Sequence, residues 1–276
     1  MRRLSIVLLL ALMLGACASL WPKDRAAGVS ASLVDFLYPK GEEIEAVTDQ
    51  VPHLPVPLTV GLAFVPSRAD CARCSAPNAA LQSELLERVK ARFADRNYIR
   101  EIKVIPEAYM RAGRGFTALD QLSRLYGFDV IALVSYDQVA LHNERKSSLL
   151  YWTLVGAYVV KGERNDVHTF VDTAVLDVKT RKLLMRAPGV DVRGFNSTSI
   201  DNARTVAGQQ DAAMRAATEQ MIANLDTELA GFRERIKSDN SVIVTRRPGS
   251  GGGGAGSLGA LTLGLLALGA WRRARR

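Results

Sequence analysis

The sequence of 276 residues predicts an α/β (α+β) fold, with one mixed β-sheet domain and helices mainly on one face. Its composition is that of a globular protein, with 48% hydrophobic and 23% charged residues. Between residues 57 and 238, apolar runs of strand length first alternate with helix-length amphipathic segments. Further apolar runs then follow one another as a meander, and a long amphipathic segment closes the domain.

The first half of this domain alternates strands with helices. Residues 58–65 (LTVGLAFV) lie between prolines and predict a buried strand, and residues 102–105 predict another. Apolar residues recur every four positions over 78–96, which predicts an amphipathic helix. A second helix should be capped by Thr117 and closed by Gly127, and residues 129–136 predict a third strand.

The second half predicts a meander and a helix. Residues 142–148 are polar and predict a turn, whereas 149–160 (LLYWTLVGAYVV) are too few to span a membrane and predict a buried strand. Residues 167–178 and 182–190 predict a hairpin. The final helix is predicted by an apolar stripe of Met214, Ala217, Met221, Leu225, Leu229, Phe232 and Ile236.

The segments that flank the domain predict connections rather than folded structure. Residues 17–56 contain four prolines and mixed charge, so we expect a tether with a short helix near Ser32–Leu37. Residues 239–256 end in a glycine run and predict a flexible linker.

The amino terminus has the order of a bacterial export signal. Two arginines precede an apolar stretch at 4–14, which is too short to cross about 30 Å of hydrocarbon. Its last residue, Leu14, is followed by Gly15, Ala16 and Cys17. These residues resemble the lipobox of bacterial lipoproteins, which implies a signal peptide at 1–16 and acylation of Cys17. The alternative is an ordinary secretory signal with an incidental cysteine.

The carboxyl terminus has a second membrane signal. The linker is followed by an apolar segment at 257–271, which is roughly 22 Å long as a helix and therefore short for a permanent span. The chain then ends in a cluster that should stay cytoplasmic, namely Arg272, Arg273, Arg275 and Arg276. The alternative is a plain tail anchor.

This order resembles the GlyGly carboxy-terminal sorting domain, whose carriers are cut by rhombosortase, a rhomboid-type intramembrane protease. The resemblance implies cleavage within Ser250, Gly251, Gly252, Gly253 and Gly254. With the lipobox, the chain resembles the rhombotarget lipoprotein family. That resemblance implies lipoprotein-processing and lipoprotein-carrier machinery as partners. Because Ala18 rather than Asp follows Cys17, it also implies an inner-membrane precursor and a mature outer-membrane lipoprotein.

The element order of the body is similar to the periplasmic domains of the curli-secretion lipoprotein and of lipoproteins that activate penicillin-binding proteins. The short pattern Asp177-Val178-Lys179-Thr180 adds to this likeness. Because one fold carries many functions, the likeness gives an architecture and not an activity.

Cys71 and Cys74 stand two residues apart between the first strand and the first helix. In an oxidising periplasm we expect them to form a structural disulfide. The alternatives are a redox-active pair at a helix amino terminus and a metal site. A zinc site would need two more ligands, and the sequence offers no second CxxC or HxxxH. We therefore expect no metal and no cofactor.

Other chemistry-bearing patterns are weak. The three histidines lie far apart, no Gly-x-Ser-x-Gly elbow occurs, and the glycine run lacks the Lys-Ser/Thr of a phosphate-binding loop. Gly113–Phe116 predicts a loop. Asp172 and Asp177 should face opposite sides of a strand. Without the six arginines at the chain ends, the formal charge of +8 falls to +2, which argues against nucleic-acid binding.

We expect a non-catalytic envelope lipoprotein whose body binds a protein or glycan partner. Two alternatives remain open. One is an envelope thiol-disulfide oxidoreductase that uses Cys71 and Cys74, and the other is a subunit of an oligomeric secretion complex.

Overall fold

A mixed β-sheet with helices forms the body of the protein. The computed structural model describes residues 25–39, 49–67, 76–144, 163–197, 201–239 and 241–247. The six-stranded sheet has the order β4-β3-β5-β6-β7, with β1 also paired to β5. Strand β3 runs parallel to β4 and β5, and the remaining pairs are antiparallel. The strands are β1 (Arg25–Ala31), β3 (Leu58–Phe64), β4 (Ile99–Val104), β5 (Val130–Glu144), β6 (Glu163–Asp177) and β7 (Lys182–Ser197).

Strand β1 occupies part of the chain that the sequence predicted to be a tether, so that prediction was wrong for residues 25–31. Strand β5 is 15 residues long, and β3 pairs with its residues 130–134 alone. Beyond that point β1 takes over the same edge and pairs with residues 136–142. The backbone groups of β5 need partners along their whole length, and β1 supplies them. The folded unit therefore includes residues 25–31 in addition to the predicted domain at 57–238.

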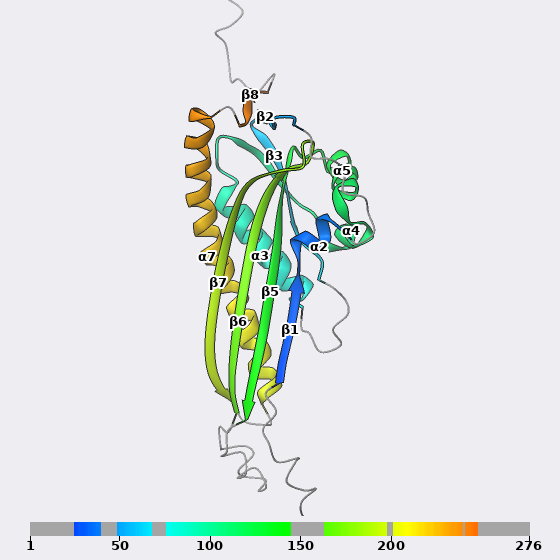
Figure 1. Ribbon diagram of the computed structural model, residues 1–276. Helices are drawn as coiled ribbons and strands as arrows, with labels where there is room; N and C mark the ends of the chain where they lie inside the picture. Colours follow the sequence, from blue (N-terminus) through cyan, green and yellow to red (C-terminus); the bar gives the residue numbers. More distant parts are fainter. Residues whose placement is uncertain are drawn as a thin grey trace, which may run out of the picture.

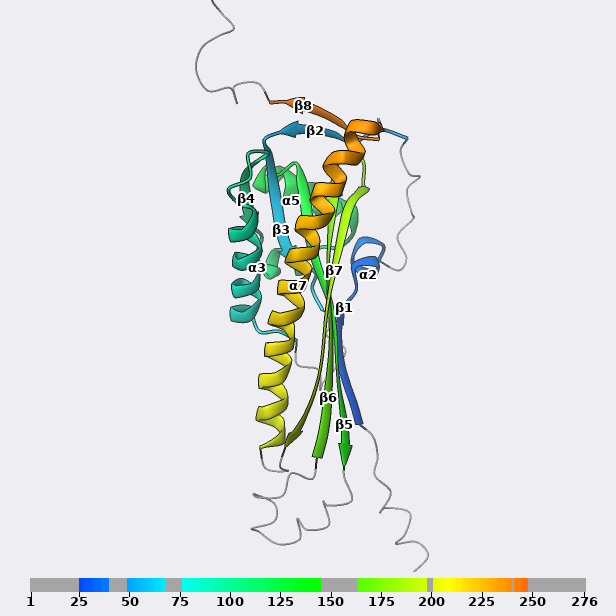
Figure 2. The same cartoon turned by 90° about the vertical axis from the view of Figure 1, so that its left-hand side faces the viewer.

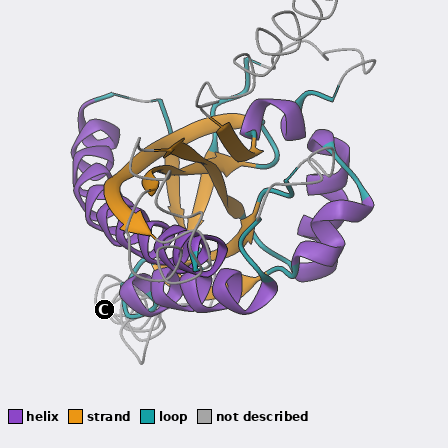
Figure 3. Ribbon diagram, turned by 90° about the horizontal axis from the view of Figure 1, so that it is seen from below, coloured by secondary structure: helices purple, strands orange, loops and turns teal. Residues whose placement is uncertain are grey.

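Helices cover both faces of the sheet. The two longest, α3 (Ala79–Phe93) and α7 (Asn202–Ser238), lie on one face (Figures 1 and 2). The shorter α2 (Leu33–Leu37) and α5 (Gly115–Tyr126) pack on the other, where Tyr38 and Phe116 meet edge to face. Both short helices were predicted, but the sequence was expected to place the helices mainly on one face, and α2 and α5 lie on the other. Seen from below, helices lie around a curved sheet (Figure 3).

The helix boundaries follow local capping. Ser32 caps α2, as the predicted short helix requires, and the Asn78 side chain accepts a hydrogen bond from the amide of Leu81 at the start of α3. Gly127 closes α5 in the left-handed conformation that favours glycine, at φ +66°. Thr117 is not the cap of this helix, because α5 begins two residues earlier at Gly115. The short α4 (Glu107–Ala112) was not predicted.

The hairpins are longer than the sequence indicated. Residues 142–144, predicted to turn, continue β5 and pair with residues 163–165 of β6. The predicted strand at 149–160 lies outside the described residues. The tight turn between β6 and β7 is confirmed, since Asp177 accepts a hydrogen bond from the amide of Thr180. Strand β7 then runs to Ser197, seven residues past its predicted end.

Helix α7 runs along the whole sheet. Its 37 residues correspond to about 55 Å. It also supplies partners to the free edge of β7 at two places, because the Gln220 side chain accepts from the amide of Val190 and the Asn224 side chain donates to the carbonyl of Pro188. Among the described helices, none combines the length and the apolarity needed to cross a membrane.

A second, two-stranded sheet closes one end of the domain. Strand β2 (His53–Val56) pairs in parallel with β8 (Ile243–Arg246). The predicted tether and linker therefore each contribute a strand to the folded unit. The described chain begins with β1 towards one end of the molecule and finishes with β8 at the other (Figure 1).

Candidate functional site

The residues predicted as sites fall largely outside the described part of the chain. These are Leu14, Gly15, Ala16, Cys17, Cys71, Cys74, Ser250, Gly251, Gly252, Gly253, Gly254, Arg272, Arg273, Arg275 and Arg276. Their predicted roles therefore stay predictions. The three interpretations of the cysteine pair also stay open.

Within the described residues, no group of three or more His, Cys, Asp and Glu side chains is placed to hold a metal ion. His53 lies on β2 beside the Thr245 hydroxyl, and His168 lies exposed on β6. Asp172 pairs with Arg186 on β7, whereas Asp177 holds the turn that follows β6. The two aspartates thus have separate structural partners and do not form a carboxylate pair.

An apolar pocket lies between the sheet, α3 and α7. Its volume is about 290 Å³, at the lower end of the range of small-molecule sites. Alternate residues of the strands form its floor, as the two-residue period of a strand requires. They are Leu58, Val60 and Leu62 of β3, Ile102 of β4, and Val130 and Ala132 of β5.

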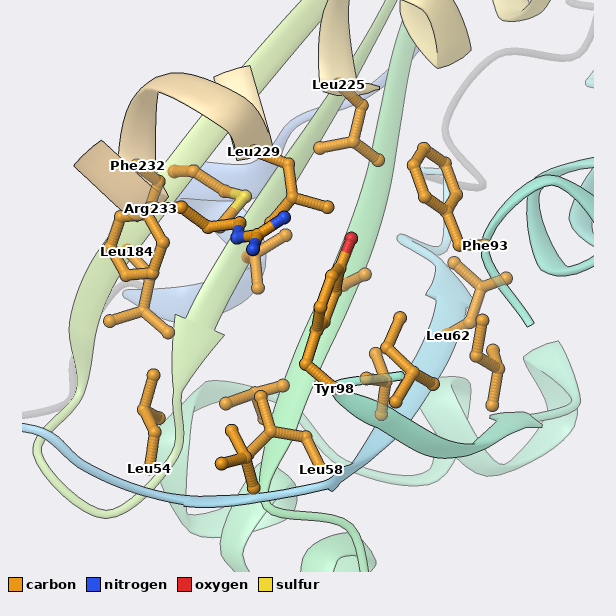
Figure 4. Close-up of a pocket in the computed structure, with 18 of the residues that line it drawn as sticks. Leu54, Leu58, Leu62, Phe93, Tyr98, Leu184, Leu225, Leu229, Phe232 and Arg233 are labelled. Carbon is orange, nitrogen blue, oxygen red and sulfur yellow. The ribbon is translucent and has the colours of Figure 1, made fainter. Parts of the chain in front are cut away.

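The helices and the small sheet complete the walls. Successive turns of α7 contribute Leu225, Leu229, Phe232 and Ile236, and α3 contributes Val89 and Phe93. Leu54 of β2 and Val244 of β8 lie at the closed end of the domain. Figure 4 shows these side chains converging from both helices and from the strands beneath them. The arrangement forms a partly open pocket whose surface is almost entirely hydrocarbon.

Polar groups enter the lining from three residues, Asn97, Tyr98 and Arg233. The Arg233 guanidinium lies over the Tyr98 ring, 5.5 Å from its centroid, in a cation–π contact. Figure 4 shows the Tyr98 hydroxyl in the middle of the site. Burial raises the pKa of Tyr98, although Arg96 and Arg233 oppose the shift, so the phenol stays protonated at neutral pH.

Two sets of ion pairs hold the walls in place. Asp226 of α7 accepts hydrogen bonds from Arg92 and Arg96, each at 2.7 Å, and so ties the end of α3 to α7. At the closed end, Asp129 accepts from Arg247 at 2.6 Å and from the amide of Thr59 at 2.8 Å. The second set attaches the residue after β8 to the start of β5. Ion pairs therefore connect the elements that surround the pocket.

Arg233 differs from these arginines. Among the described residues it has no ion-pair partner, and its side chain contacts the Tyr98 ring instead. A guanidinium keeps its charge at any physiological pH. The lining thus combines apolar walls with one exposed positive charge, which together with the stronger effect of Lys237 also lowers the pKa of the neighbouring Glu234.

The comparisons with known proteins give no family. No protein-family model and no curated protein matches the chain. Among solved structures, it is similar to a dodecamer of a PelC point variant from Paraburkholderia phytofirmans, with 11% sequence identity and a TM-score of 0.26. That match covers 72% of this chain and 99% of the other. A similarity at this level carries no argument about fold or function.

Sequence reasoning found the elements around the pocket but not the pocket itself. The strand at 58–65 and the apolar stripe of the last helix were both predicted, and both supply lining residues. Nothing in either pattern shows that the facing side chains leave space between them. Arg233 directly follows Phe232 of the apolar stripe, and a charged residue at that place on an amphipathic helix does not indicate a site.

Proposed function

We propose that this protein is a non-catalytic envelope lipoprotein whose folded domain binds an apolar ligand in the pocket beneath α7. The anchoring part of the proposal is supported by the sequence around Cys17 and by the carboxyl-terminal order of glycines, apolar segment and arginines. Cleavage by a rhomboid-type protease would remove the second membrane attachment and leave the lipid at Cys17. The mature form is then an outer-membrane lipoprotein, and the disulfide between Cys71 and Cys74 remains part of this proposal.

The binding part rests on one observation, the apolar cavity of about 290 Å³. The pocket is partly open to solvent, since Asn97, Arg233 and Val244 of its lining are exposed, and an open apolar pocket with a few polar groups is the usual form of a small-molecule site. Glycan recognition needs many hydrogen-bonding side chains, and the described lining offers three polar residues. An apolar group therefore fits the site better than a sugar.

The anchoring part is tested by the intact mass of the protein purified from membranes. We expect the mass of a chain that begins at an acylated Cys17, has lost the residues after the glycine run, and holds an oxidised cysteine pair. A chain that starts at Met1 and still carries Arg276 would contradict the proposal.

The binding part is tested with an apolar dye whose fluorescence rises on burial. We expect the wild-type protein to bind one equivalent. Ala132 is 5% exposed and lines the floor, so Ala132→Leu should fill the space and abolish binding without unfolding the domain. Equal dye binding by the two proteins, both folded by circular dichroism, would remove the pocket from the proposal.

A further inference from the structure

The lining of the pocket is apolar over most of its surface and carries a positive charge at one place. Its floor and helical walls are aliphatic and aromatic, whereas Arg233 and Tyr98 lie together at one place in the lining. Arg233 is exposed to solvent, so its guanidinium can pair with an anionic group at the edge of the pocket while an attached chain lies against the apolar lining. A ligand that suits both parts has an apolar chain and an anionic end.

We propose that the site binds a single-chain amphiphile with an anionic head, whose acyl chain fills the pocket and whose head is bound by Arg233. This inference rests on the proposed function, because it takes the pocket as the ligand site. Arg233 presents several N–H donors in a planar fork that matches a carboxylate or a phosphate. Tyr98 keeps its hydroxyl hydrogen at neutral pH and supplies a further donor beside it.

The volume limits the size of the ligand. A space of about 290 Å³ lies at the lower end of the range for small-molecule sites, about 300–1,000 Å³. This favours one acyl chain over the two chains of a bilayer phospholipid. Leu54 and Leu184 lie at one side of the site and Phe93 and Leu225 at another, with the strands beneath them (Figure 4). Flexible aliphatic side chains of this kind suit a chain of methylene groups.

Two natural sources share this chemistry, a fatty acid and a lysophospholipid. Both present one acyl chain and one anionic group, so the experiment uses a probe for each. The probes are photoactivatable derivatives of laurate and of lauroyl-lysophosphatidylglycerol. A photoactivatable dodecanol, with the same chain and no charge, is the neutral control.

The full-length protein in phosphatidylcholine nanodiscs is labelled with each probe, and the labelled residues are located by mass spectrometry. We expect both anionic probes to label pocket-lining residues such as Leu225 and Leu229. A preference for laurate or for the lysolipid identifies the source. Arg233→Gln should reduce labelling by the anionic probes about tenfold or more, because a charge-assisted hydrogen bond is lost. Labelling by dodecanol should stay unchanged in this variant.

Arg235→Gln is the matched control. Arg235 lies two residues further along α7, pairs with Glu228 at 3.9 Å and does not line the pocket. We expect wild-type labelling from this variant. Ala132→Leu should abolish labelling by all three probes, and Leu229→Trp, which fills the site from the helix side, covers the case in which the first variant does not fold.

The outcomes separate the two proposals. If wild type and Arg233→Gln label equally with laurate, lysolipid and dodecanol, head-group recognition is wrong although the pocket still binds an apolar chain. If no probe labels the lining residues, or if Ala132→Leu and Leu229→Trp label like wild type, the pocket is not a ligand site and both proposals fail.

Discussion

The two ends of the interface between α7 and the sheet are built from different residues. At the pocket end, which contains the start of β5 and the last turns of α7, large apolar side chains face one another around a cavity. At the opposite end, where β5 ends and β6 begins and which we call the hairpin end, the first turns of α7 meet the sheet through buried polar side chains and mostly small apolar ones. There the Gln138 side chain donates to the Thr169 hydroxyl at 2.7 Å and to the carbonyl of Gln210 at 2.9 Å.

A second polar cluster follows at the hairpin end. The Asn165 side chain donates to the Ser197 hydroxyl and to the Asn202 side chain. The buried apolar residues beside it are small, namely Ala140, Val167 and Ala213, and the partly buried Phe195 and Val206 pack against them. Directional bonds between buried partners fix one register and allow little separation. Large apolar side chains carry no such direction, so the same helix can leave room for a ligand further along. The pocket end therefore provides the space for a ligand, and the hairpin end fixes the position of α7 along the sheet.

The largest loss of folding stability is expected from a substitution opposite the middle of α7, between the two ends of the interface. Gly189 of β7 lies against the middle of α7, and a Cβ there would stand 2.0 Å from the Ala217 carbonyl oxygen and 2.6 Å from the Met221 nitrogen. Since both atoms belong to the backbone, Gly189→Val must push α7 away from the sheet. We expect a loss of about 3 kcal/mol or more, or no folded protein, in urea unfolding.

Gly208→Ala is the control, because a Cβ at Gly208 of α7 meets nothing within 4 Å. It should raise stability by about 0.5–1 kcal/mol through helix propensity. If Gly189→Val unfolds at the same urea concentration as wild type, the close contact between β7 and α7 does not exist.

Truncations on α7 should distinguish packed from open positions. Met214 is 1% exposed and lies towards the hairpin end, so Met214→Ala should cost about 2–5 kcal/mol. Leu229 already faces the cavity and is partly buried, so Leu229→Ala should cost less than Met214→Ala in the same urea titration. Equal losses at the two positions would indicate that the pocket is packed.

The interaction between Gln138 and Thr169 at the hairpin end can be measured as a coupling free energy. Gln138→Leu leaves the Thr169 hydroxyl and the Gln210 carbonyl without this partner and should cost about 1–3 kcal/mol. In a double-mutant cycle with Thr169→Val, we expect the two losses to be less than additive. Strict additivity would show that the two side chains do not interact.

The smallest change in stability is expected at Asp172 of β6. Burial raises the pKa of Asp172, with Arg186 opposing the shift, and the residue is 3% exposed. The folded state therefore holds this proton more tightly than the unfolded state, and stability is lost as pH rises through the window between the two pKa values. Asp172→Asn should have a higher Tm than wild type at pH 7, and the gain should shrink as pH falls to 4. A gain that is independent of pH would refute this account of Asp172.

The sequence predicted the elements well where a period was clear. The strand at 58–65, the helix over 78–96 and the long last helix all rest on apolar spacing, and the structure places β3, α3 and α7 there. It failed for β1, because the pairing of residues 25–31 depends on the free edge of β5, more than a hundred residues away. Long-range pairing of this kind leaves little local signal.

The pocket was missed for a related reason. Apolar spacing identifies the face of a strand or helix that is buried, but not the distance between two buried faces. Val130 and Leu229 look like ordinary core residues in the sequence, and only their relative placement shows that a space remains between them. Arg233 was equally inconspicuous, because charged residues are common on an amphipathic helix.

The central claim is that the pocket holds an acyl chain in the envelope-anchored protein. The most direct test is the non-denaturing mass of the protein released from its native membrane in a lipid-solubilising polymer, compared with its denatured mass. We predict that wild type carries one non-covalent acyl amphiphile that is lost on denaturation, and that folded Ala132→Leu carries none. A wild-type protein with no bound amphiphile, or an equal amount on both proteins, would contradict the account.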